Sequence, residues 1–114
     1  ISASPNGAAL AAVQFINENF AKNLSVEDVA AAVNLSYSYF SRQFKSFSGH
    51  SIHEYITIRR ISEAKHLLTT TDLPLKRIAS ASGYRSESSF IVSFQAREGC
   101  TPTDYRRRFS ARRE

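Results

Sequence analysis

LSVEDVAAAVNLSYSYFSRQFKSFSGHSIHEY, at residues 24–55, returns in altered form at residues 73–105 as LPLKRIASASGYRSESSFIVSFQAREGCTPTDY. In the first half of this segment the matching residues lie 49 positions apart, as Ala30 and Ala79 do. In the second half they lie 50 apart, as Phe40 and Phe90 do, so one residue has been added where a turn can absorb it. A repeat that keeps its apolar spacing indicates one supersecondary unit built twice. Each copy has the pattern of a helix-turn-helix.

Apolar residues recur every three to four positions along the whole chain, which predicts helices and no strands. Capping sequences mark where helices start, and glycines mark where they end. The expected helices cover about residues 6–21, 25–33, 36–49, 51–69, 72–82, 86–99 and 101–109. The fold class is therefore all-α, with two helix-turn-helix lobes joined by a long connector helix and about seven helices.

These helices divide the chain into four segments. Residues 1–7, rich in Ser, Ala, Pro and Gly, are interpreted as the end of an interdomain linker. Residues 8–50 form the first lobe, 51–70 the connector helix, and 71–114 the second lobe with a basic C-terminal tail. The chain begins at Ile1 and contains no Met, so we expect it to be part of a longer protein.

Large apolar side chains mark the expected cores. The stripe of the first helix is expected to consist of Leu10, Val13, Phe15, Ile16 and Phe20. The third helix is expected to bury Phe40, Phe44 and Phe47, and the sixth to bury Phe90 and Phe94. Small residues at Ala30 and Ala79 allow the two helices of each pair to cross closely.

The net charge of +5 is unevenly distributed. Residues 1–57 carry three basic and four acidic side chains, whereas residues 58–114 carry twelve basic and six acidic ones. A basic half favours a polyanionic partner such as nucleic acid. No apolar run approaches the roughly 20 residues that span a bilayer, and the lone Cys100 cannot form an internal disulfide. These features predict a cytoplasmic protein that has no membrane partner.

Three segments carry a resemblance to a known family. SYSYFSRQFK at residues 36–45, RRISEAKHLL at residues 59–68 and the run from Gly83 to Arg106 closely resemble the AraC/XylS-type bacterial transcription regulators. The resemblance covers about Leu24–Phe109. It implies a unit that binds double-stranded DNA without cofactor or catalysis, by placing two recognition helices in successive faces of the major groove. It also implies an effector-binding or dimerisation domain before Ile1, and RNA polymerase as a further partner.

Carried over by position, the resemblance puts Ser38, Ser41 and Arg42 of the first recognition helix on base edges. Arg42 is the strongest candidate, because a guanidinium can pair bidentately with O6 and N7 of guanine. The alternative is that Arg42 is a solvated charge on an exposed helix face.

The second recognition helix departs from the family pattern. Its matching positions are Glu87, Ser88, Ile91 and Val92, and a basic or polar residue is expected where Val92 stands. Ile91 and Val92 can pack on thymine methyl groups but cannot donate hydrogen bonds to guanine. In the alternative reading, Ile91 packs into the second lobe. We therefore expect most base specificity in the first copy, and an asymmetric DNA site.

A further group of side chains is expected to contact phosphates: Ser36, Tyr37, Lys45, Arg59, Arg85 and Ser86. Such contacts set register and salt dependence rather than sequence preference. Ordinary solvation is the alternative for each of them. Arg59 can instead pair with an acidic side chain such as Glu54, Glu63 or Asp104.

Other classes of function are disfavoured. His50 and His53 lack the Cys/His spacing of a zinc site, so no metal is expected. The chain has neither a nucleophile elbow nor a Gly-rich phosphate loop, so no enzyme is expected. One remaining alternative is a basic helical protein-interaction module that docks on an acidic partner such as RNA polymerase. RNA binding is also open, although the chain offers no RNP-like pattern of stacking aromatics. Sequence-selective binding to duplex DNA separates these readings.

Overall fold

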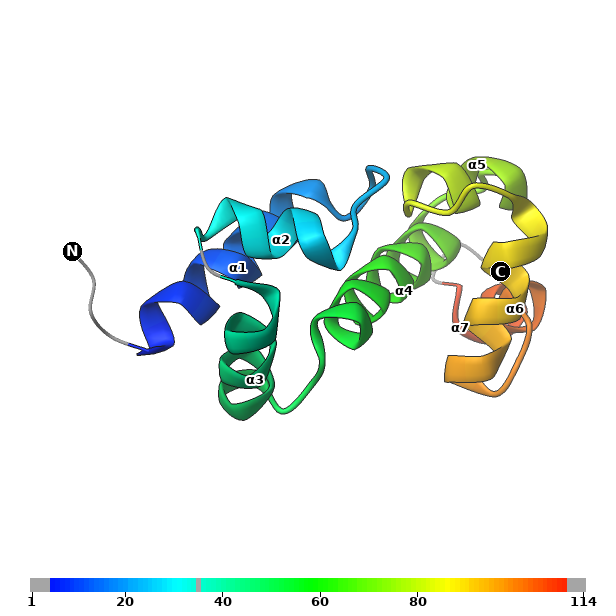
Figure 1. Ribbon diagram of the computed structural model, residues 1–114. Coiled ribbons are helices and arrows are strands. Elements are labelled where there is room, and N and C mark those ends of the chain that lie inside the picture. Colours follow the sequence, from blue (N-terminus) through cyan, green and yellow to red (C-terminus); the bar gives the residue numbers. More distant parts are fainter. Residues whose placement is uncertain (1–4, 35, 111–114) are drawn as a thin grey trace. The chain divides into compact units, whose positions relative to one another are not determined.

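The computed structural model describes residues 5–34 and 36–110. Within these residues the chain forms seven helices and no strands (Figure 1). The helices are α1 (Pro5–Asn19), α2 (Val26–Ala32), α3 (Tyr37–Ser48), α4 (Ile52–Thr70), α5 (Leu75–Ala81), α6 (Glu87–Glu98) and α7 (Pro102–Phe109). This confirms the all-α fold class, with helix-turn-helix pairs at α2 and α3 and at α5 and α6.

Some segments predicted from the sequence are only partly among the described residues. Three predicted parts of the chain lie outside the described residues: Leu35 of the first turn, residues 1–4 of the expected linker and residues 111–114 of the expected basic tail. Pro5–Gly7, expected in the linker, are the first residues of α1.

The chain divides into two compact units, Ile1–Arg59 and Arg60–Glu114. The boundary lies inside α4, so the start of this helix belongs to the first unit and its remainder to the second. Each unit has its own cluster of buried apolar side chains. Both units therefore include a part of α4, the helix that the sequence indicated as the connector.

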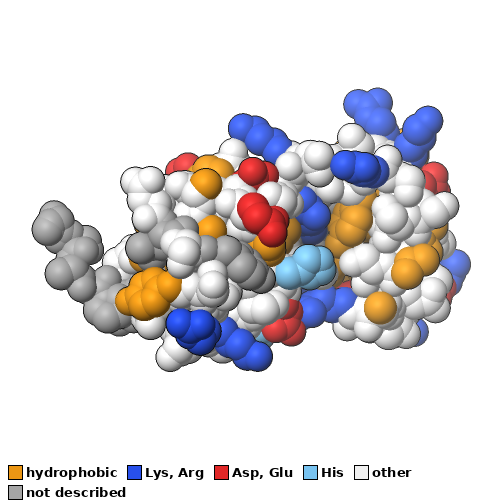
Figure 2. Space-filling model, viewed as in Figure 1, with side chains coloured by type: hydrophobic (Ala, Val, Ile, Leu, Met, Phe, Trp, Pro, Cys, Tyr) orange, Lys and Arg blue, Asp and Glu red, His pale blue; other side chains and the backbone are white. Residues whose placement is uncertain are grey.

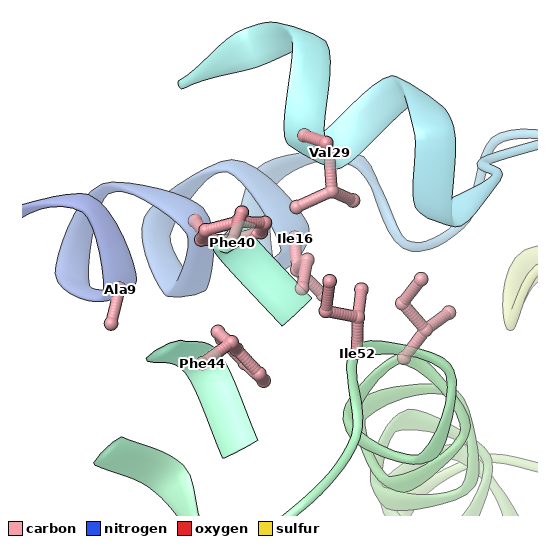
Figure 3. Close-up of a cluster of buried hydrophobic side chains, with 9 residues drawn as sticks. Ala9, Ile16, Val29, Phe40, Phe44 and Ile52 are labelled. Atoms are coloured by element: carbon pink, nitrogen blue, oxygen red, sulfur yellow. The ribbon is translucent and has the colours of Figure 1, made fainter. Parts of the chain in front are cut away.

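Four helices build the core of the first unit (Figure 3). α1 contributes Ala9, Ala12 and Ile16, and the other helices contribute Val29, Ala30, Phe40, Phe44, Ile52 and Ile56. Each of these residues has at most 4% of its surface exposed. The alanines of α1 leave room for the bulky rings of α3, which packs against it.

Two apolar residues lie outside this core, against expectation. Leu10 is 57% exposed, because small alanines rather than leucine occupy the inward face of α1. Phe47 is 40% exposed and belongs neither to the buried cluster nor to the apolar residues packed around it. The prediction that Phe47 continues the buried stripe of α3 is therefore wrong, since the core ends before the last turn of that helix.

The second unit repeats this architecture, with the C-terminal part of α4 in the place of α1. Ile61, Ala64 and Leu68 are buried with the same spacing as the core residues of α1, 52 positions later. They share the second core with four side chains of α5 and α6: Ile78, Ala79, Phe90 and Phe94. The duplication thus extends one helix further back than the sequence match that begins at Leu24.

The local geometry of the two copies also agrees. α2 and α5 each have seven residues, and α3 and α6 each have twelve. The ring of Phe44 meets that of Tyr55 edge-on at 5.8 Å, and Phe94 meets Tyr105 edge-on at 5.5 Å. Residues 38–50 match residues 88–100 position by position in being buried, half-buried or exposed. α3 and α6 therefore expose the same positions to solvent, each within its own unit.

Both turns contain a left-handed backbone residue. Asn34 has φ of 58° in the first turn, and Gly83 has φ of 100° at the matching position of the second. Asparagine and glycine reach this region at lower cost than other residues. The added residue therefore follows this position and precedes the helix caps Ser36 and Ser86.

Candidate nucleic-acid interface

α3 turns one face into the core and another to solvent. Phe40 and Phe44 are fully buried, whereas Ser38, Arg42 and Lys45 are exposed. The three exposed residues follow one another at spacings of four and three, so they form one stripe along the helix. A hydroxyl followed by two long cations is suited to a nucleic acid, because it can reach both base edges and phosphates.

The other residues predicted on this helix are partly engaged by their own backbone. Ser41 is half-buried, and its hydroxyl donates to the Ser38 carbonyl at 3.2 Å, which leaves it only as an acceptor. Ser36 is exposed, and its hydroxyl accepts a hydrogen bond from the Tyr39 amide at 3.4 Å as the N-cap of α3. The side chain of Tyr37 lies outside the described residues.

A hollow of about 540 Å³ lies beside this stripe, between α3 and the start of α4. It is lined by Ser41, Arg42, Lys45, Ser46, Ser51, Ile52 and His53. Sequence reasoning missed Ser46, Ser51 and His53 as interface candidates. Ser46 could have been found, because it lies one helical turn after Arg42 on α3. Ser51 and His53 depend on how the chain turns from α3 into α4, which residue spacing does not reveal.

α6 offers different chemistry at the matching positions. Glu87 and Ser88 are exposed, and Val92 is 69% exposed. Ile91 is half-buried and packs against the second core, so only part of its side chain faces solvent. The stripe of α6 is therefore apolar and acidic, where that of α3 is basic.

The residues predicted to contact phosphates are not equally available. Lys45 and Arg85 are exposed. Arg59 donates from Nε to Asn17 Oδ1 at 2.8 Å, and its guanidinium lies 4.5 Å from the centre of the Phe20 ring. These contacts tie α4 to α1 and the residue that follows it, within the first unit. The structure thus gives Arg59 a position in the fold that its spacing from acidic residues did not suggest.

Ser86 and two arginines of α7, Arg106 and Arg107, are also engaged in the second unit. Ser86 accepts a hydrogen bond from the Ser89 amide at 3.1 Å and so caps α6. Arg107 pairs with Asp104 at 2.8 Å, and this hydrogen bond is the main reason why the pKa of the Asp104 carboxyl is lowered. Arg106 donates to backbone carbonyls at the end of α4. Arg107 and Arg108 both remain exposed, and Arg107 is partly neutralised by its ion pair with Asp104.

The described residues contain no group of three or more His, Cys, Asp or Glu side chains placed to hold a metal ion. Across residues 5–34 and 36–110, no helix combines the length and the apolar character needed to cross a bilayer.

The sequence is similar to curated regulators over most of its length. A family model described as a helix-turn-helix domain matches residues 29–108. The lactose operon transcription activator of Staphylococcus xylosus is 36% identical over 99 residues, which cover 87% of this chain and 36% of the activator. The melibiose operon regulatory protein of Escherichia coli K12 is 35% identical over 100 residues, or 88% and 33% of the two chains. The chain thus spans about a third of the length of these relatives.

Solved structures share the fold. The C-terminal domain of AraT, a response regulator from Geobacillus stearothermophilus, has a TM-score of 0.88 at 33% identity, covering 94% of this chain and 91% of that one. The DNA-binding domain of AdpA, solved in complex with a target DNA, has a TM-score of 0.86 at 28% identity, covering 92% and 95%.

The fold and the two exposed recognition helices define a helix-turn-helix protein of the DNA-binding class. The chain belongs to the AraC-type family of bacterial transcription regulators. The relatives named above are regulators and not enzymes.

Proposed function

We propose that this chain binds double-stranded DNA in a sequence-specific manner and thereby regulates bacterial transcription. α3 and α6 each enter the major groove of the duplex as recognition helices. Membership of the AraC-type family and the likeness to a domain solved on DNA support the proposal. The duplicated helix-turn-helix supports it further, because a double helix repeats its grooves along its length.

The observation that carries this proposal is the exposed Arg42 on α3, between Ser38 and Lys45. A guanidinium there can donate two hydrogen bonds to one guanine, which discriminates against another base by about 1–3 kcal/mol. Ser38 and the acceptor lone pairs of Ser41 contact neighbouring base edges, and Lys45 contacts a phosphate.

α6 contributes less to base recognition in this proposal. Val92 and the exposed part of Ile91 pack on thymine methyl groups, and Ser88 reaches a base edge. Glu87 can accept a hydrogen bond from a cytosine amino group, but it also repels nearby phosphates. The DNA site is therefore asymmetric, with most base specificity under α3.

Further partners belong to the full-length protein, of which this chain corresponds to about a third in the curated relatives. We propose that an effector-binding or dimerisation domain precedes this chain, and that the DNA-bound protein recruits or blocks RNA polymerase. The resemblance to operon regulators supports both parts.

Arg42→Ala tests the proposal, with Lys45→Ala as a matched control on the same helix. The preferred sequence is first selected from a pool of random duplexes. Arg42→Ala is expected to weaken binding to that sequence by about 1–3 kcal/mol and to relax the preference at one base pair. Lys45→Ala is expected to weaken binding to all duplexes alike and to reduce the salt slope by about 0.9. Anisotropy titrations against single base-pair variants measure both effects.

Two results would contradict this assignment. If Arg42→Ala weakened binding to every duplex equally, Arg42 would contact a phosphate and not a base. A selected pool with no preferred sequence, together with loss of all binding to competitor DNA, would favour the alternative of a basic protein-interaction module.

A further inference from the structure

The two helix-turn-helix copies carry opposite charges on their first helices. Glu27 and Asp28 stand in the first turn of α2, and Lys76 and Arg77 stand at the matching positions of α5. Residues 26–37 contain two acids and no base, whereas residues 75–87 contain three bases and one acid, so the net charge changes from −2 to +2. Figure 2 shows acidic side chains over α2 and Lys and Arg side chains over α5. The charge has been reversed on a scaffold that is otherwise repeated.

The acidic side chains in the first turn of α2 stabilise that helix, whereas the basic side chains in the first turn of α5 destabilise it. A helix N-terminus carries partial positive charge, so acidic side chains in the first turn stabilise the helix and basic ones destabilise it. α2 also has a capping box, in which the Ser25 hydroxyl accepts from the Asp28 amide at 3.1 Å and the Ser25 amide donates to the Asp28 carboxylate at 3.0 Å. α5 follows Pro74 without a side-chain cap. Lys76 and Arg77 therefore weaken their own helix, which indicates a role outside the fold.

Lys76 lines a hollow of about 500 Å³ in the second unit. Ser80 lines it one turn later on α5, and Arg85 and Ser86 line it from the turn before α6. Both cations are exposed. The carboxylate of Glu87 also lines the hollow and offsets one of these two charges, which leaves it with a net positive charge. The Ser86 hydroxyl donates to the Ser89 hydroxyl at 3.1 Å, so the two cations and the Ser80 hydroxyl are the donors that the hollow offers to an anionic phosphodiester.

Tyr84 holds the turn that carries Arg85 against α6. Its hydroxyl and the Ser93 hydroxyl share a hydrogen bond of 2.8 Å, and its ring lies 5.5 Å from the ring of Phe90. The guanidinium of Arg60 lies 5.9 Å from the centre of the Tyr84 ring. Burial lowers the pKa of Arg60, yet a guanidinium remains protonated in proteins. These contacts fix the turn that carries Arg85 beside α6.

We propose that the second unit holds the phosphate backbone of duplex DNA through Lys76 and Arg85, whatever the base sequence, while α3 of the first unit reads bases. This inference rests on the proposed function, because both units act on the same duplex. Phosphate contacts position a protein without carrying sequence information. The basic first helix of the second copy thus supplies the affinity that the apolar Val92 cannot.

Lys76→Glu tests the inference, because it gives α5 the charge that Glu27 gives α2. The thermal midpoint is expected to rise, since an acid replaces a base in the first helical turn. Affinity is expected to fall by the same factor for every duplex, roughly threefold or more at about 100 mM salt, with a salt slope smaller by about 0.9. Arg85→Gln is expected to cause the same loss of affinity through the other side of the hollow.

Arg97→Glu is the matched control. It makes the same change of charge in the last turn of α6, where a base stabilises the helix, and five residues after Val92 it faces a different side of that helix. We expect it to lower the thermal midpoint and to leave affinity nearly unchanged.

Three outcomes separate this inference from the proposed function. If Lys76→Glu binds like the unaltered chain while Arg42→Ala still relaxes base preference, the inference is overturned and the proposed function stands. If the unaltered chain has no base preference but Lys76→Glu and Arg85→Gln weaken binding, the phosphate contact stands and the proposed function fails. Equal losses of affinity from Lys76→Glu and Arg97→Glu would mean that only overall charge matters, which also overturns the inference.

Discussion

Single side chains at matched positions distinguish the two copies. Arg42 and Val92 occupy the same exposed place on α3 and α6. Val33 and Ser82 occupy the same place at the ends of α2 and α5. Ser82 is fully buried, and its hydroxyl finds no hydrogen-bond partner among the described residues, a state that costs about 1–3 kcal/mol. The two copies share a scaffold but differ at single positions, both in the groups that they expose and in the groups that they bury.

Val92→Arg tests the chemical difference between the reading helices. The side chain at this position is 69% exposed, so a guanidinium can be accommodated without disturbing the core. Binding to all duplexes is expected to strengthen at low salt, and the salt slope is expected to grow by about 0.9 if the new cation meets a phosphate. Titrations over a series of salt concentrations measure both quantities.

Thr103→Arg serves as its control, because it adds the same charge at an exposed position of α7, outside the proposed interface. Unchanged affinity of the Val92 variant at low salt, or an equal gain from both variants, would show that this face of α6 does not meet DNA.

At the scale of the element, α4 is anchored at its C-terminal end by α7. Arg106 donates from Nε to the Leu68 carbonyl at 3.1 Å and from Nη2 to the carbonyls of Thr71 and Leu73 at 3.1 and 2.9 Å. The last carbonyls of a helix have no partner within it, so a guanidinium is well suited to this place. The short C-terminal helix thereby stabilises the longest helix of the chain.

Arg106→Lys is expected to lower the free energy of unfolding by about 1.5–3 kcal/mol, because one ammonium cannot reproduce the planar set of donors. Urea denaturation followed by circular dichroism measures the change. Arg107→Lys is the control, since an ion pair as exposed as that between Arg107 and Asp104 contributes little to stability. An Arg106 variant as stable as its control would mean that water replaces these hydrogen bonds without loss.

At the scale of the whole molecule, the chain has two separate cores built to one plan. Phe44 and Phe94 are the matched rings of these cores, both fully buried and both packed edge-on against a tyrosine. Each belongs to one core only. Stability is therefore expected to be distributed between two units that share one helix.

Phe44→Ala and Phe94→Ala test this organisation. Each removes a buried ring at a cost of roughly 3–5 kcal/mol. Phe44→Ala is expected to reduce hydrogen-exchange protection mainly in α1, α2 and α3, and Phe94→Ala mainly in α5, α6 and α7. Equal loss of protection in both units from either substitution would show instead that the chain unfolds as a single cooperative body.

The sequence by itself determined where the helices and turns lie. Their signals are local: apolar periodicity, serine and threonine caps, and residues such as Asn34 and Gly83 that accept a left-handed backbone. The repeat predicted a duplicated helix-turn-helix, and the family resemblance placed Arg42 among the base-contacting positions, where its guanidinium made it the strongest candidate. Periodicity, caps and turn residues act within a few positions, and the repeat appears when the sequence is compared with itself, so no contact in space was needed to find them.

Tertiary structure determined which side chains remain exposed and available to contact a partner. Leu10 and Phe47 are exposed because they lie outside the first core, which a helical stripe alone cannot reveal. Arg59 is held by Asn17, 42 positions earlier, and Ile91 is half covered by the second core. The role of α4 in both units emerged in the same way, because burial depends on segments that are distant in the chain. Local sequence determined the helices and turns, and packing between distant segments determined which helix faces remain exposed to a partner.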